Sequence, residues 1–88
     1  MPTPAIIERV RDLQRELAET PDAARASHPE VPAIEQQIET IMLDPSQVHL
    51  YTSLNDRLLK AYVAFEIDHP KLARAMIDVA TALGNAGL

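Results

Sequence analysis

The residues of this chain that are best suited to chemistry lie directly before one proline. Glu66, Asp68 and His69 occupy three of the four positions that precede Pro70. Carboxylate and imidazole side chains bind divalent metals and transfer protons, so their proximity suggests a metal site or an acid–base pair. The structural alternative is that Asp68 or His69 caps a helix that begins at Pro70, with Glu66 as a solvated side chain.

The spacing of these residues favours the structural alternative. Residues two and three positions apart across a helix break have no fixed common geometry, and the chain has no His-Glu-x-x-His pair of the kind that binds zinc. The other histidines, His28 and His49, lie far away in sequence. We therefore expect no catalytic, cofactor-binding or metal-binding residue. The alternative hypothesis is a small-ligand or metal-binding protein that uses Glu66, His69 and His49.

Other catalytic signatures are absent from the sequence. None of Ser27, Ser46 and Ser53 stands in a Gly-x-Ser-x-Gly turn, and there is no glycine-rich loop to bind phosphate. Because the chain has no cysteine, disulfides and thiolate metal sites are excluded. These observations predict a protein that is not an enzyme.

Length and composition indicate one small domain. Eighty-eight residues suit a single helical domain over 1–88. The first nine residues lack the basic and long apolar regions of a signal peptide, and no apolar run approaches the ~20 residues of a membrane span. We expect a cytoplasmic protein without membrane contact.

The net charge of −5 is unevenly distributed. Residues 1–18 and 45–88 are balanced, and the surplus acid lies in the middle of the chain, where Arg25 is the only base. The acids of this middle segment are Glu19, Asp22, Glu30, Glu35, Glu39 and Asp44. A chain with no basic stripe is a poor candidate for nucleic-acid binding. The acidic segment could bind a basic protein partner, but we favour a solvated surface.

Prolines and caps divide the chain into helices. Thr3-Pro4, Asp44-Pro45 and His69-Pro70 each place proline at a first helical position, with a cap before it. Strand-like alternation is absent. The expected fold is all-α: an antiparallel helical bundle or helical hairpin of about four helices, completed by dimerisation. The expected helices are 4–19, 32–43, 45–67 and 70–83.

The sequence also predicts features of the segments that connect these helices. Pro29 and Pro32 predict a rigid connector over residues 27–32, and Gly84 is expected to cap the last helix. His28-Pro29-Glu30-Val31 and His69-Pro70-Lys71-Leu72 share a His-Pro-x-aliphatic pattern. We interpret the two as separate uses of the same helix-start chemistry, not as a duplication.

The helix expected at 45–67 is apolar over about half of its circumference, nearly twice the usual stripe. Val63, Ala64 and Ile67 add apolar atoms on its opposite side. Such a helix needs partners on more than one face, and a dimer formed through it is the usual solution. The alternatives are that this apolar face is ordinary core or that it lines a ligand pocket. The candidate interface residues are Tyr51, Leu54, Leu58, Tyr62 and Phe65.

The end of this helix resembles a known family. Phe65, Glu66, His69, Pro70 and Leu72 form a Phe-Glu-x-x-His-Pro-x-Leu pattern, and the chain closes with Gly87-Leu88. This ending resembles that of an uncharacterised bacterial family of small all-helical proteins, a domain of unknown function. The resemblance implies a small cytoplasmic bacterial protein and assigns no activity, substrate or cofactor. We predict a non-catalytic helical module that self-associates or binds another protein.

Overall fold

The computed structural model describes residues 4–87, and this part of the chain is helical without any strand. Its elements are α1 (Pro4–Ala18), α2 (Asp22–Ser27), α3 (Glu30–Leu43), α4 (Val48–Ala61), the short 3₁₀ turn η1 (Tyr62–Phe65) and α5 (Pro70–Asn85). The all-α prediction is confirmed, as are its four longer helices. The expected cap at Thr3 and the close at Leu88 lie outside the described residues. Completion of the fold by dimerisation stays a prediction.

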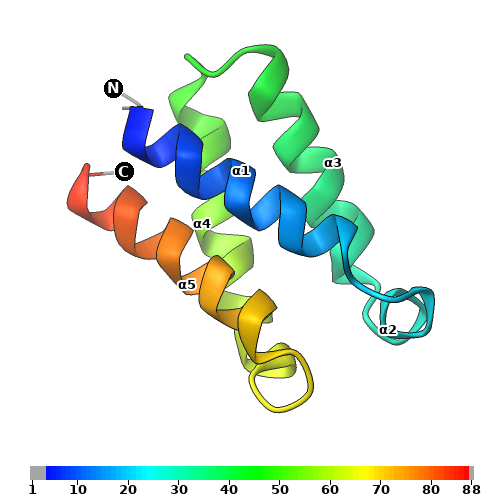
Figure 1. Cartoon of the computed structure of the whole chain (residues 1–88). Coiled ribbons are helices and arrows are strands. Elements are labelled where there is room, and N and C mark those ends of the chain that lie inside the picture. The colour runs from blue at the N-terminus through cyan, green and yellow to red at the C-terminus, as the bar shows by residue number, and fades with distance from the viewer. Residues whose placement is uncertain (1–3, 88) are drawn as a thin grey trace.

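The four longer helices pack around one hydrophobic core. α1 lies against α5, α4 contacts both α3 and α5, and α1 also reaches α3 (Figure 1). Figure 1 shows that α1 and α5 run side by side in opposite directions. None of the helices within residues 4–87 combines the length and apolar character needed to cross a membrane. The position of α4 between two neighbours determines which of its side chains stay accessible.

The packing face of α1 is the narrow stripe that its sequence predicts. Ile6, Val10, Leu13 and Leu17, spaced by four, three and four residues, are all buried. At 3.6 residues per turn this spacing keeps the side chains on one line along the helix. The polar residues of α1 therefore lie on its remaining surface, including the side that faces the start of α5.

The second long helix begins earlier than expected. We predicted a rigid connector through Pro32, but α3 begins at Glu30 and includes Pro32 as its third residue. The first turn of a helix has amide groups without intrahelical acceptors, so a proline there removes no hydrogen bond. Upstream, residues 22–27 form the short helix α2.

The third long helix begins later than expected. The predicted cap, Asp44, instead closes the turn before α4: its carboxylate accepts hydrogen bonds from the Ser46 amide at 3.3 Å, the Ser46 hydroxyl at 2.6 Å and Gln47 Nε2 at 2.9 Å. These bonds, the Ser46 hydroxyl first, hold the pKa of Asp44 below its ordinary value. The Tyr51 hydroxyl donates to the Pro45 carbonyl at 2.8 Å and ties the turn to α4.

The ends of the last two helices also differ from the prediction. The expected helix 45–67 ends at Ala61 and tightens into η1, because a 3₁₀ turn allows the chain to reverse before Pro70. α5 continues through Gly84 to Asn85, and Gly87, with φ of 79°, is the glycine that adopts the left-handed conformation. Gly84 is therefore not the cap.

The short helix α2 is held by one side chain. α2 buries none of its residues, but the Arg25 guanidinium donates to both carboxylate oxygens of Glu35 and to the carbonyls of Leu17 and Thr20. Arg25 therefore joins α2, α3 and the end of α1. The guanidinium also neutralises the charge of Glu35. One carboxylate of the acidic middle segment is therefore already paired and does not attract a basic partner.

Candidate functional site

Most of the predicted interface lies in the core of the single chain. Tyr51, Leu54, Leu58 and Phe65 have no exposed surface, while Tyr62 is half-buried. Because α3 and α5 both pack against α4, one chain covers most of the wide apolar stripe. The alternative of ordinary core therefore describes these four residues, and Tyr62 alone keeps accessible surface.

Phe65 brings the two His-Pro segments together. Its ring centroid lies 4.3 Å from that of His28 and 6.3 Å from that of His69, and the two imidazole centroids are 6.3 Å apart. His28 Nδ1 also lies 3.4 Å from a carboxylate oxygen of Glu30. Sequence reasoning noted the shared His-Pro pattern but did not place the segments in contact. These contacts give Phe65 and His69 a structural role, which is to hold the links before α3 and α5 against each other.

The residues singled out for chemistry do not converge. Glu66 and Asp68 are exposed, and His69 occupies the cap position of α5 without forming a side-chain capping bond. Pro70 is the first helical residue, as expected. His49 is exposed in the first turn of α4, at the opposite end of that helix from His69. Residues 4–87 contain no group of three or more histidine or acidic side chains that could hold a metal ion.

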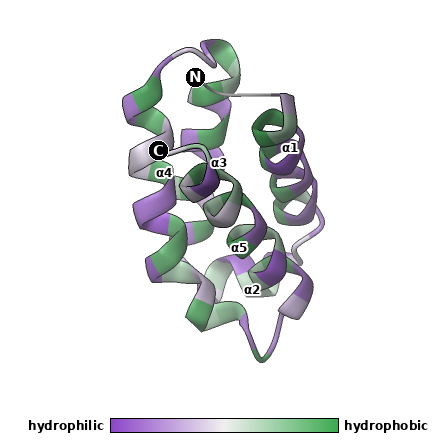
Figure 2. Cartoon of the chain, turned by 90° about the vertical axis from the view of Figure 1, so that its left-hand side faces the viewer, coloured by the Kyte–Doolittle hydropathy of each residue, from purple (hydrophilic) through white to green (hydrophobic). Residues whose placement is uncertain are grey.

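A line of hydrophobic side chains remains at the surface. Leu59, Val63 and Ile67 are 48%, 61% and 92% exposed and follow one another at intervals of four residues from α4 through η1 to the next link. We call these three residues the apolar ridge. Figure 2 shows hydrophobic segments reaching the edge of the molecule where α4 leads towards α5. The sequence signal for Val63 and Ile67 is the apolar set on the far side of the expected helix 45–67, whereas Leu59 was expected in the main apolar stripe.

A groove of about 530 Å³ lies between α5 and the segment formed by η1 and the link that follows it, and two of its lining residues, Tyr62 and Glu66, are sequence neighbours of the apolar ridge. Its charged residues are Glu66, Arg74 and Asp78, and Arg74 Nε lies 3.3 Å from Asp78 Oδ1. We call it the α5 groove. The structure thus places Tyr62, Glu66 and Pro70 along one hollow. The other residues that line it are Tyr62, Pro70, Ala73, Ile77 and Thr81.

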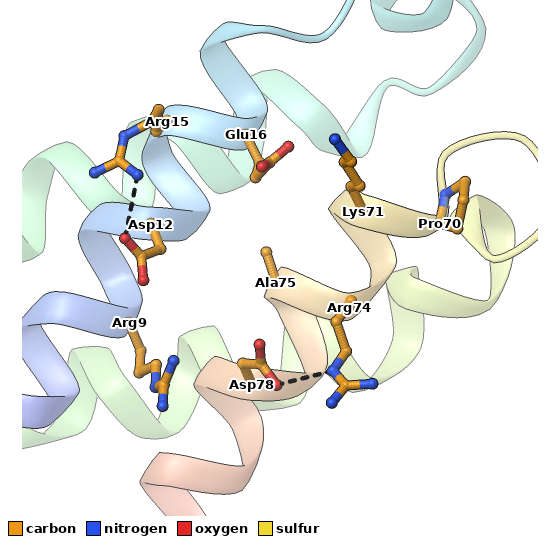
Figure 3. A pocket seen from close by; sticks show the side chains of 9 residues that line it. All are labelled: Arg9, Asp12, Arg15, Glu16, Pro70, Lys71, Arg74, Ala75 and Asp78. Carbon is orange, nitrogen blue, oxygen red and sulfur yellow. Dashed lines mark hydrogen bonds and ion pairs between the residues drawn. The ribbon is translucent and has the colours of Figure 1, made fainter.

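A second, charged groove of about 480 Å³ separates α1 from α5, with the small side chain of Ala75 between the charged ones (Figure 3). Its ion pairs, Arg15 with Asp12 at 3.4 Å and Arg74 with Asp78, each lie within one helix. With four bases against three acids, the groove favours neither anions nor cations strongly. Sequence reasoning missed it because its residues belong to the two ends of the chain. The charged residues are Arg9, Asp12, Arg15, Glu16, Lys71, Arg74 and Asp78.

Comparison with known proteins supports the sequence resemblance at the level of a family. Residues 6–88 match the family model described as "Domain of unknown function (DUF4404)". No curated protein and no solved structure matches the chain. The description of the family assigns no activity. Any conclusion about function therefore rests on the arrangement of the apolar ridge and the two grooves.

Proposed function

The chain belongs to the DUF4404 family, a domain of unknown function, and we propose that it is a non-catalytic helical module that pairs with a second copy of itself. The contact surface is the outer face of α4, η1 and α5, formed by the apolar ridge and the α5 groove. The proposal keeps the long helix as the centre of association. It moves the contact from the buried aromatic stripe to the side of the helix that the core leaves open.

The exposure of the apolar ridge is the observation that supports this proposal most. Monomeric proteins scatter single hydrophobic residues over their surface, whereas a continuous exposed group often marks a protein interface. Fully burying one such side chain stabilises a contact by roughly 1.5–3 kcal/mol. Ile67 and Val63 are mostly exposed and Leu59 is half exposed, so most of this stabilisation is available to a partner.

The charges around this surface favour a second copy as the partner. Near the ridge and groove, three acids are matched by three bases, whereas the acidic middle segment carries all of the net charge of −5. Two copies that meet through the middle segment would repel each other, but a balanced surface can oppose itself without net repulsion. The residues of the balanced set are Lys60, Glu66, Asp68, Lys71, Arg74 and Asp78.

The size of the surface sets the expected affinity. In a two-fold pair the ridge is buried twice, once from each copy. Association also costs at least about 4 kcal/mol of lost translational and rotational freedom. A contact with three hydrophobic side chains per copy therefore suits a weak pair, with a dissociation constant of roughly 10–100 µM.

Sedimentation equilibrium over about 5–500 µM tests this proposal, because that range brackets the expected dissociation constant. The weight-average mass is expected to rise from the 9.7 kDa of one chain towards twice that value. High salt should weaken the pairing only slightly, since the buried contact is mainly apolar. A mass that stays at 9.7 kDa at the highest concentration contradicts self-association.

A further inference from the structure

Ile67 is the most exposed of the large hydrophobic side chains in the described part of the chain, at 92%. It lies in the link between η1 and α5, and this link is anchored from inside. The His69 amide donates to the Phe65 carbonyl at 2.8 Å, and the Phe65 ring packs against His28 and His69. Isoleucine has few rotamers, so ordering this side chain in a contact costs little entropy. Ile67 is therefore presented to solvent on a held turn.

The α5 groove can receive such a side chain. Tyr62, Ala73 and Ile77 give it apolar walls, and its volume of about 530 Å³ is sufficient for more than one aliphatic side chain. Ile67 does not line the groove of its own chain, although Glu66 and Pro70 on either side of it do. The exposed isoleucine and two of the residues that line the groove thus belong to the same short stretch of chain, and the isoleucine does not fill the groove of its own copy.

From this arrangement we infer that Ile67 of one copy inserts into the α5 groove of a second copy, and that the same contact occurs in reverse. The inference rests on the proposed self-association and specifies its anchor. A face that carries both a protruding side chain and a hollow satisfies the requirement of a two-fold interface, in which the same surface meets itself. One well-packed hydrophobic anchor commonly dominates the stability of such an interface.

A charged residue next to Ile67 and a charged residue of the α5 groove have opposite signs. Asp68 directly follows Ile67, and Arg74 lines the groove with its side chain 79% exposed. Insertion of Ile67 brings Asp68 of one copy towards Arg74 of the other. Arg74 already pairs with Asp78, but a guanidinium has five N–H donors and can donate to a second carboxylate as well. The two-fold symmetry repeats this ion pair, which favours the predicted register over random apolar contact.

Cysteine pairing tests the contact cleanly, because the chain has no cysteine of its own. Copies with Ile67→Cys are mixed with differently tagged copies that carry Ile77→Cys, and the disulfide-linked species are identified by mass. A disulfide needs Cα atoms roughly 4.4–6.8 Å apart. The mixed pair is expected to form at least about tenfold faster than the pair of Leu43→Cys with Ile77→Cys. Leu43 is a matched control, since it is 86% exposed and ends α3 away from the groove.

A second variant covers the case in which a cysteine disturbs the fold. Ile67→Ala is expected to raise the dissociation constant at least about tenfold. It should not change the unfolding midpoint of the monomer, measured well below the dissociation constant, because the side chain has almost no contact in the single chain. Leu43→Ala should change neither quantity. If the wild type dimerises but Ile67→Ala does not weaken the dimer, or the Ile67→Cys variant links no faster than the control, the inference is wrong while the proposed self-association stands. If the wild type does not dimerise, both are wrong.

Discussion

Replacing Phe65 with alanine is expected to lower the free energy of unfolding by about 3–5 kcal/mol, the usual cost of removing a buried phenylalanine ring. Phe65 is fully buried, joins the end of α4 to α5 and contacts both His28 and His69. A chain of this length has a total stability of roughly 4–13 kcal/mol. The variant should therefore unfold at a much lower urea concentration, as measured by far-UV circular dichroism.

Val63→Ala is the matched control for this experiment. Val63 belongs to the same 3₁₀ turn but is 61% exposed. At concentrations where the chain is monomeric, its truncation should change the free energy of unfolding by no more than about 0.5 kcal/mol. Equal losses in the two variants would mean that Phe65 is not the centre of the core at this end of the molecule. A stable Phe65→Ala variant that has lost self-association would return Phe65 to the interface, where the sequence first placed it.

The double variant Leu59→Lys/Val63→Lys is expected to stay folded and to dissociate at least about 100-fold more readily than the wild type. Both side chains are substantially exposed in the single chain, and lysine is well tolerated on a helix surface. In a two-fold pair, however, four ammonium groups would have to lose water against apolar surface. Sedimentation should therefore detect a monomer at concentrations where the wild type is paired.

Leu43→Lys controls for the added charge in this comparison. Leu43 is as exposed as the ridge residues but lies at the end of α3. Its substitution makes the net charge less negative, as the double variant does, without touching the apolar ridge. Equal association of Leu43→Lys and the double variant would place the contact elsewhere on the molecule.

The helices themselves follow closely from local sequence. The spacing of Ile6, Val10, Leu13 and Leu17 predicts the buried side of α1, and proline predicts the start of α5. The first and last residues of the helices are less predictable, because the same short sequence motif can adopt several backbone geometries. Aspartate is a residue type that often caps helices, yet the carboxylate of Asp44 closes a turn with Ser46 and Gln47. Local chemistry alone does not decide between these two uses of the same oxygen atoms.

The site is harder to predict because it depends on which helices cover which faces. A stripe such as Tyr51, Leu54 and Leu58 has the same pattern whether its partner is the same chain or another one. The sequence indicates a helix with more apolar surface than one partner can cover. Only the packing of α3 and α5 against α4 shows that the surplus lies at Leu59, Val63 and Ile67. The contact of His28 with His69 around Phe65 was likewise invisible, since 41 residues separate the two histidines.

The Phe-Glu-x-x-His-Pro-x-Leu pattern at the end of α4 also acquires a physical interpretation. Phe65 and Leu72 are buried in the core, Pro70 begins α5, and His69 packs against the neighbouring link. These four positions are explained by folding alone. Glu66 differs from them, because it is exposed, lines the α5 groove and has no role in the helix start or the core. It is the motif residue with the greatest scope for a role in binding.

The central claim is that α4, η1 and α5 present a surface that pairs with itself, and amide chemical shifts recorded during dilution test it most directly. Spectra of labelled wild-type protein from about 1 mM down to about 10 µM span the expected dissociation constant. We predict concentration-dependent shifts for residues 59–67 and 73–81, and unchanged shifts for the acidic segment 19–44. Spectra that do not change with concentration, or changes confined to residues 19–44, would contradict the claim.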